Sequence, residues 1–157
     1  MRKIVLVALA FAACTSSPDG SAITFDICGP ITVRAPTATP DELASLDDAF
    51  AMWRALGVAE LSRDDFATDP AITLEFREAA PAFHGLYDAP SASIYVNLDL
   101  IDREPRAIAI AHELGHAFGL GHVSATERVS VMNPGNLVER PDDGDRIALD
   151  AVWGRCR

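Results

Sequence analysis

The chain has 157 residues and a formal net charge of −10 at pH 7. This length is enough for one domain of ordinary size and too short for two. An acidic surface repels phosphate backbones, so we expect no nucleic-acid partner and attribute the charge to solubility.

The N-terminal residues 1–13 have the pattern of a secretory signal. A short basic start precedes an unbroken apolar run that begins at Ile4. The run is too short to span a bilayer as a permanent helix and matches the apolar core of a signal peptide. We therefore predict an exported protein in which residues 14–21, rich in Ser, Pro and Gly, form a tether and residues 22–157 form the folded domain.

The residues at the end of this signal fit two kinds of cleavage site. Phe11-Ala12-Ala13-Cys14 resembles a bacterial lipobox, in which Cys14 would receive a lipid and anchor the protein at the cell-envelope surface. Alternatively, Ala10 and Ala12 form an ordinary small-residue cleavage signal, and the protein is freely secreted. In the first case, the lipid is the protein's contact with the membrane.

Cys28 and Cys156 lie near the two ends of the predicted domain. An exported protein reaches a compartment that permits disulfides. We therefore predict a disulfide between these two cysteines, which would close a loop of almost the whole domain.

The N-terminal part of the domain predicts a strand followed by a long helix. Residues Ile23 to Val33 are apolar and β-branched with an interruption near Pro30, which indicates a first strand with a break. Thr39 suits the N-cap of a helix and Glu42 completes a capping box, while Gly57 offers a stop. The apolar stripe of this helix comprises Leu43, Leu46, Phe50 and Trp53.

Three more strands and two more helices follow. Alternating apolar and polar residues predict a strand over 72–77, and residues 83–87 and 93–98 predict two others. A second helix begins at Pro105 and runs to about Phe118, and a last helix covers 142–153. This order gives an α/β or α+β domain with one mixed sheet. The apolar contacts expected of the last helix are Ile147, Leu149, Val152 and Trp153.

The second helix ends in the sequence H-E-L-G-H-A-F-G-L-G-H. His112 and His116 are four residues apart, so both imidazoles lie on one side of the helix and can reach one metal ion. Glu113 is rotated by about 100° from His112. It can therefore lie beside an open coordination position without being a ligand, and we predict it as the catalytic base.

A third ligand requires the chain to turn back after this helix. Gly119 tolerates the positive φ of such a turn, and His122 then approaches the ion from the far side. Three protein ligands and one open position are typical of a catalytic zinc site. The fourth histidine of the chain, His84, is predicted to be a partly exposed strand residue without a ligand role.

This long motif is similar to that of the metzincin zinc metalloproteases, and it looks most like the matrixin branch. Ser130-Val131-Met132-Asn133-Pro134 resembles the methionine turn of that family, which implies that Met132 lies beneath the zinc. The resemblance implies a metzincin-like α+β catalytic domain over 22–157. That domain would have a mixed, twisted five-stranded sheet, an active-site helix and a C-terminal helix.

Several residues bear on which metzincin branch the chain resembles and on which metal ligands it offers. Val123 after the third histidine and Asn133 after Met132 differ from the matrixin pattern, so the branch stays open. No tyrosine follows Tyr95, which excludes a tyrosine as fifth ligand of the astacin type. We expect Zn²⁺ as the cofactor; aspartates offer ligands for Ca²⁺, but the sequence assigns none of them.

These features predict a monomeric zinc-dependent endopeptidase. Glu113 would accept a proton from the water that attacks the peptide carbonyl. The resemblance places one strand at the sheet edge above the cleft, where an extended peptide or protein substrate would pair with it. That strand is Ser93, Ile94, Tyr95, Val96, Asn97 and Leu98. Side-chain selectivity would come from residues 133–141.

Two alternatives remain. The protein could be a non-catalytic zinc-binding surface lipoprotein, although a site kept for structure alone has no need of Glu113. It could also keep the zinc hydrolysis and act on cell-wall peptide cross-links.

Overall fold

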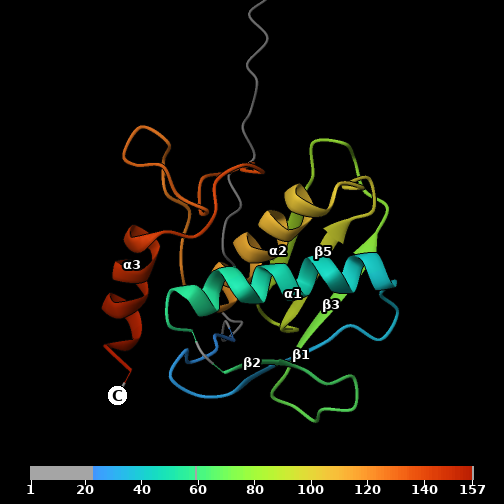
Figure 1. Cartoon of the computed structure of the whole chain (residues 1–157), viewed down its shortest axis with the longest axis horizontal. Helices are drawn as coiled ribbons and strands as arrows, with labels where there is room; N and C mark the ends of the chain where they lie inside the picture. Colours follow the sequence, from blue (N-terminus) through green and yellow to red (C-terminus); the bar gives the residue numbers. More distant parts are fainter. Residues whose placement is uncertain (1–22, 59, 157) are drawn as a thin grey trace, which may run out of the picture.

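The computed structural model describes residues 23–58 and 60–156, which fold into five strands and three helices (Figure 1). This is the α+β class expected from the sequence. In chain order the elements are β1 (Ile31–Arg34), α1 (Pro40–Ala55), β2 (Leu61–Arg63), β3 (Ile72–Arg77), β4 (Gly85–Asp88), β5 (Ser93–Asn97), α2 (Arg103–Ala117) and α3 (Asp143–Trp153).

The five strands form one mixed sheet in the order β2-β1-β3-β5-β4. Neighbouring strands are parallel except β4, which is antiparallel to β5. The first strand is shorter than predicted, because residues 23–30 lie in irregular structure and turns. β2 was not anticipated, since three residues are too few to show an alternating pattern.

Helices α1 and α2 pack against each other, and α2 lies against β4 and β5 (Figure 1). Alternate residues of β1 and β3 are buried, as in a sheet that faces the core on one side. The Trp53 indole N–H donates to the carbonyl of Ala111 at 2.9 Å and thereby links the two helices. The Phe118 ring meets Trp53 edge to face, with 5.4 Å between centroids. This packing fixes the helix that carries the histidine motif.

The start of α1 confirms the predicted capping box. Thr39 accepts the Glu42 backbone N–H, and the Glu42 carboxylate accepts the Thr39 backbone N–H at 2.7 Å. Each side chain thereby satisfies a backbone donor that a helix start leaves free. Gly57, with a φ of +88°, follows the helix as the predicted stop.

Helix α3 lies apart from the sheet, at the left of Figure 1. It meets the domain along a narrow stripe: Leu149 is fully buried, and the Trp153 indole N–H donates to the Phe118 carbonyl at 2.7 Å. The predicted apolar contact of Ile147 was wrong, because this side chain is 69% exposed; Val152 is half exposed and lies near Gly119.

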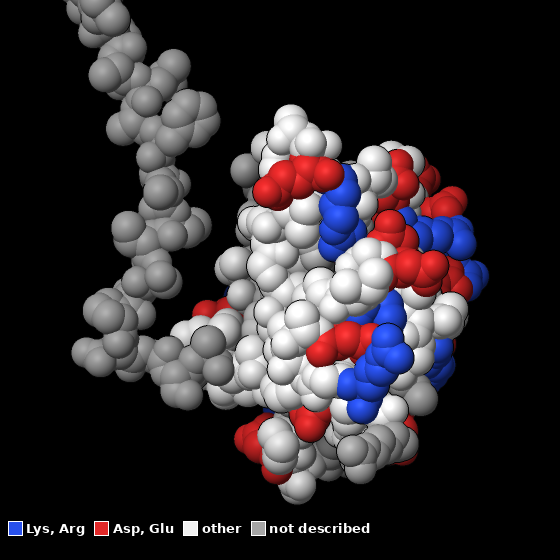
Figure 2. All heavy atoms as spheres, turned by 90° about the vertical axis from the view of Figure 1, so that its left-hand side faces the viewer, with Lys and Arg blue, Asp and Glu red and all other residues white. Residues whose placement is uncertain are grey.

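The face of the molecule that carries α3 mixes both signs of charge. Figure 2 shows acidic and basic side chains next to each other there. Two of the ion pairs formed by residues of this region are Arg128–Asp142 at 3.4 Å and Arg146–Asp150 at 2.6 Å. In both pairs an arginine of this region lies beside a carboxylate.

No helix within residues 23–58 and 60–156 combines the length and apolar character that a membrane span needs. The predicted signal peptide (1–13), tether (14–21) and lipidated Cys14 lie outside the described residues, so these predictions stand as made.

The segment before β1 and the segment after α3 are joined by a disulfide between Cys28 and Cys156. These are the two cysteines that the sequence pairs, and they are 128 residues apart. In the chain-entropy description, so long a loop restricts the unfolded chain and stabilises the fold by roughly 4–5 kcal/mol.

We expect Cys28→Ser to lower the free energy of unfolding by roughly 4–5 kcal/mol for that reason. Denaturant titration of the oxidised protein measures the change. The double variant Cys28→Ser/Cys156→Ser is the matched control and should lose no more than the single variant. A loss below about 1 kcal/mol in both would contradict the stabilising role of the bond.

Candidate metal centre

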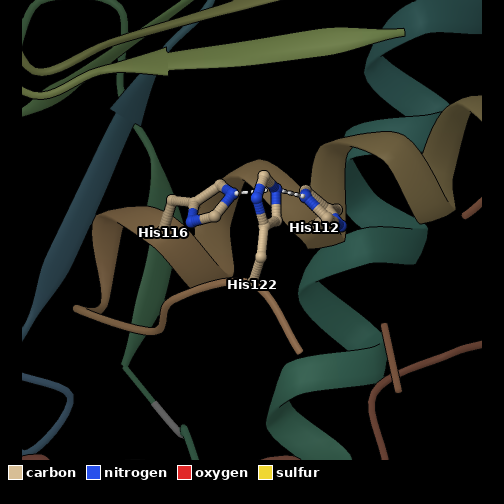
Figure 3. A group of neighbouring side chains, drawn as sticks. All are labelled: His112, His116 and His122. Carbon is tan, nitrogen blue, oxygen red and sulfur yellow. Dashed lines mark hydrogen bonds between the residues drawn. The ribbon is translucent and has the colours of Figure 1, made fainter. Parts of the chain in front are cut away.

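Three imidazoles converge on one point at the end of α2 (Figure 3). His112 and His116 project from the same side of α2, and His122 reaches them from the loop that follows. The Nε2 atom of His122 lies 3.2 Å from the Nε2 atoms of both other rings. One ligand atom from each ring lies within 4.8 Å of the other two. The three histidines are therefore close enough to bind a single metal ion, as the sequence predicts.

Backbone carbonyls orient two of the three rings. The Nδ1 of His112 lies 2.6 Å from the Val131 carbonyl oxygen, and the Nδ1 of His116 lies 2.8 Å from that of Leu120. A carbonyl only accepts, so each Nδ1 carries the proton and donates it. Each Nε2 then holds a lone pair that points at the centre of the cluster. This arrangement is the usual way in which proteins fix metal-binding histidines.

The protonation of these rings also fits a cation. Burial lowers the pKa of His112, and burial lowers the pKa of His116 to about 4, so both are neutral at pH 7. Neutral imidazole is the form that binds metals. The Nε2 atoms of both rings lie 3.2 Å from the Nε2 of His122, so one positive ion could be bound by all three nitrogens. The donor set thus suits a transition-metal ion.

Glu113 lies beside this cluster, on the side of α2 that faces strand β4. Burial raises the pKa of its carboxyl to about 8, and a hydrogen bond from the Tyr87 backbone partly opposes that increase. A cation nearby would favour the ionised carboxylate. Gly85 permits this close approach, since a Cβ there would lie 2.8 Å from Glu113 Oε1. Glu113 is therefore a buried carboxyl held next to the metal position but outside the ligand set.

A cleft of about 650 Å³ opens over the three histidines and Glu113. Strand β4 borders it, and the sheet order makes β4 the edge strand. The prediction that Ser93–Leu98 forms this edge was wrong, because β5 lies between β3 and β4. His84, half-buried just before β4, faces the same cleft. The other lining residues are Thr24, Ala82, Phe83, Gly85, Leu86, Tyr87, Ala89, Ala109, Gly119, Leu120, Gly121, Pro134, Gly135 and Asn136.

The loop that contains Met132 packs directly against the metal-binding helix. Met132 is fully buried, and its sulfur contacts α2 at Gly115, where a Cβ would overlap it. Gly115 lies between His112 and His116 in the sequence, so Met132 supports the helix where both ligands project. The adjacent Val131 supplies the carbonyl that orients His112.

Asn133 holds this loop in shape at the position where the sequence departs from the matrixin pattern. Its side-chain oxygen accepts the Ser130 backbone N–H at 2.9 Å. Its amide nitrogen donates to the carbonyls of Val123 and Arg128 at 2.9 and 3.0 Å. Asn133 therefore ties the turn to the segment that follows His122.

Asp145, in the first turn of α3, joins that helix to the same loop. It is completely buried and accepts hydrogen bonds from the Ser130 hydroxyl at 2.5 Å and the Val131 backbone N–H at 3.3 Å. The Arg128 guanidinium donates to it at 2.7 Å. A buried carboxylate is tolerated when donors surround it in this way.

We expect Asp145→Ala to lower the free energy of unfolding by about 3 kcal/mol or more, because buried donors lose their acceptor. Metal affinity should fall as well, since Val131 orients His112. Thermal unfolding and metal titration measure the two effects. The matched control is Asp143→Ala at an exposed position of the same turn, which should change stability by less than about 0.5 kcal/mol. Equal effects of the two substitutions would contradict this role.

Sequence reasoning missed three contributors to the site, namely Gly85, Tyr87 and Asp145. The spacing of Asp142 and Asp145 could have revealed the capping box of α3, which the structure forms. It could not have revealed the bonds from Asp145 to the loop, because they join segments distant in sequence. Gly85 and Tyr87 lie beside Glu113 only because β4 packs against α2, and this long-range contact has no signature in the local sequence.

No protein-family model matches the chain, and no curated protein matches it with significant similarity. What the protein does is therefore inferred from its residues and from the geometry of this site.

Proposed function

We propose that the protein is a zinc-dependent endopeptidase of the metzincin type. The observation that carries this proposal is the convergence of three imidazoles, two of them oriented by backbone carbonyls, beside a buried carboxyl that is not a ligand. A cleft bordered by a free strand edge adds a place for an extended peptide. The long histidine motif and the loop at Met132 support the metzincin assignment by resemblance.

Zinc is the metal we propose for this centre. Neutral imidazoles suit a borderline-soft divalent ion, and three of them leave a tetrahedral ion one open position. His112, His116 and His122 would hold it. When bound, zinc supplies Lewis acidity and lowers the pKa of water at the open position to near 7.

Glu113 is the proposed general base. Its position next to the ligand cluster lets it take a proton from the attacking water and then deliver that proton to the leaving amine nitrogen. Burial removes competing water, so the proton passes between the carboxyl and the reacting groups.

An extended substrate would pair with the edge of β4 and not with β5. β-Augmentation of this kind supplies backbone hydrogen bonds that do not depend on side chains. Pro134, Gly135 and Asn136, which line the cleft after the Met132 loop, are the proposed start of the wall that selects side chains.

The test is digestion of casein by the purified protein, with and without a metal chelator. We expect cleavage that the chelator stops and that added Zn²⁺ restores. A protein that retains zinc but leaves casein and a mixed peptide pool intact would support the non-catalytic zinc-binding lipoprotein instead. Cleavage of purified muropeptides alone would assign cell-wall cross-links as the substrate.

A further inference from the structure

The free edge of β4 exposes the backbone groups of only some of its residues. The Asn97 N–H donates to the His84 carbonyl at 3.0 Å, so His84 directs its backbone groups towards β5. Backbone direction alternates along an antiparallel strand. Gly85 and Tyr87 therefore direct their N–H and C=O groups to the free edge, and the turn residue Ala89 follows directly after β4.

One end of this edge is already occupied by the chain itself. The Ile23 N–H donates to the Ala89 carbonyl at 3.2 Å, and the Ile23 carbonyl accepts the Tyr87 hydroxyl at 2.6 Å. Two residues later, the Phe25 N–H donates to the Ala117 carbonyl at 2.8 Å. We call Ile23, Thr24 and Phe25 the bridge segment.

The bridge segment crosses from the end of the edge strand to the end of the metal-binding helix. Phe25 is buried, which fixes the segment to the domain, and Thr24 between the two anchors lines the cleft. A peptide lying along β4 would therefore reach Ile23 beyond Asp88. There the edge offers it no further backbone partner, because Ile23 already occupies the Ala89 carbonyl. At the opposite end, beside Gly85, no such segment is hydrogen-bonded to the edge within the described residues.

We infer that the bridge segment closes the cleft at one end, so that the enzyme recognises substrates mainly through residues that follow the scissile bond. This inference rests on the proposed peptidase function and adds the class of substrate segment that the site accepts. That class is a peptide with two or three residues in the cleft before the scissile bond and a longer run after it. A longer N-terminal part must turn away from the sheet edge.

Strand geometry gives both the direction of the bound peptide and the number of its residues that fit before the scissile bond. A peptide added to an exposed edge forms the more stable pairing when it runs antiparallel to its neighbour. Its N-terminal side then lies towards Ala89. Glu113 is next to Gly85 and Tyr87. The scissile bond of a bound peptide should therefore lie opposite the stretch of β4 between these two residues. Ala89 is two residues further, about 7 Å along the strand, which leaves space for two to three substrate residues.

A peptide series measures this asymmetry. Peptides would be built around the main site that the protein cuts in casein and lengthened by one residue at a time on either side. We expect kcat/KM to stop rising after the third residue before the scissile bond. Each early addition after the bond should raise it roughly two- to tenfold, the range of one net backbone hydrogen bond. Equal gains on both sides, or a plateau on the C-terminal side instead, would overturn the inference.

The bridge itself is tested by Ile23→Pro in the full-length protein. Proline lacks the N–H that bonds to the Ala89 carbonyl, and Ile23 is exposed, so the change removes a bond from a position at the surface. The matched control is Ile23→Val, which keeps the N–H. In Ile23→Pro, a fourth or fifth residue before the scissile bond should now raise kcat/KM about threefold or more relative to the three-residue peptide. An unchanged plateau in a correctly folded variant would contradict the role of the bridge.

A binding measurement separates this inference from the proposed function. The same peptides would be titrated calorimetrically into Glu113→Gln, which should bind them without cutting. Tighter binding with length on the C-terminal side only supports the closed end, whatever the rate at which the unmodified protein cuts these peptides. Binding that tightens equally with length on both sides rejects the closed end and leaves the peptidase proposal untouched.

Discussion

Glu113→Gln is expected to lower kcat for peptide hydrolysis by roughly 10²–10⁴-fold while the metal content stays unchanged. The substitution removes the group that takes the proton from water but keeps the shape of the side chain. The glutamine side chain has nearly the same size and shape, so its close packing against Gly85 should be preserved. Steady-state kinetics on the best casein-derived peptide, with elemental analysis of the same sample, measures both quantities.

The fold should tolerate this change. Burial raises the pKa of Glu113 to about 8, so burying the charged form is costly and the neutral amide avoids that cost. We therefore expect a melting temperature at or above that of the unmodified protein. Glu113→Ala should show the same loss of activity, and it should also leave a cavity where the side chain was buried. Full activity in either variant would remove Glu113 from the reaction, and loss of the metal would show that it is a ligand.

His122→Ala should reduce bound metal from about one equivalent per chain to a trace. Two histidines on one helix then remain, and two ligands hold zinc far more weakly than three. His122 is exposed in the loop after α2, so its removal should leave the fold intact. Elemental analysis after dialysis, with far-ultraviolet circular dichroism as the check on folding, gives the result.

His84→Ala is the matched control for that experiment. His84 lines the same cleft but stands outside the three-histidine cluster, so this variant should keep its metal. Because a bound ion stabilises the folded state, a chelator should lower the melting temperature of the unmodified protein and of His84→Ala. It should have no effect on His122→Ala. Metal retained by His122→Ala and lost by His84→Ala would reverse the assignment of the third ligand.

Local signals predicted the parts of the structure that depend on neighbours in sequence. The capping box of Thr39 and Glu42 places the start of α1, because both partners lie within one turn. The spacing of His112, His116 and His122 brings three rings together, because a helix and one turn at Gly119 determine their positions. These features need no knowledge of the rest of the fold.

Features that depend on distant segments could not be obtained in that way. Strands β4 and β5 were both predicted, but which of them forms the edge depends on pairing with β3, which no local pattern encodes. No local pattern indicates that Asp145, an acidic residue at a helix start, is completely buried and hydrogen-bonded to the Met132 loop. The bridge segment was assigned to the first strand, and its backbone bonds to Ala89 and Ala117 became apparent only in three dimensions.

X-ray absorption at the zinc edge of the purified protein tests most directly whether three imidazoles hold one zinc ion with a vacant coordination position. We expect three histidine nitrogens at about 2.0–2.1 Å and a fourth light ligand that a peptide hydroxamate replaces. A fourth ligand contributed by a protein side chain and unmoved by the hydroxamate, or a protein purified without metal that fails to take up zinc, would contradict the proposed centre.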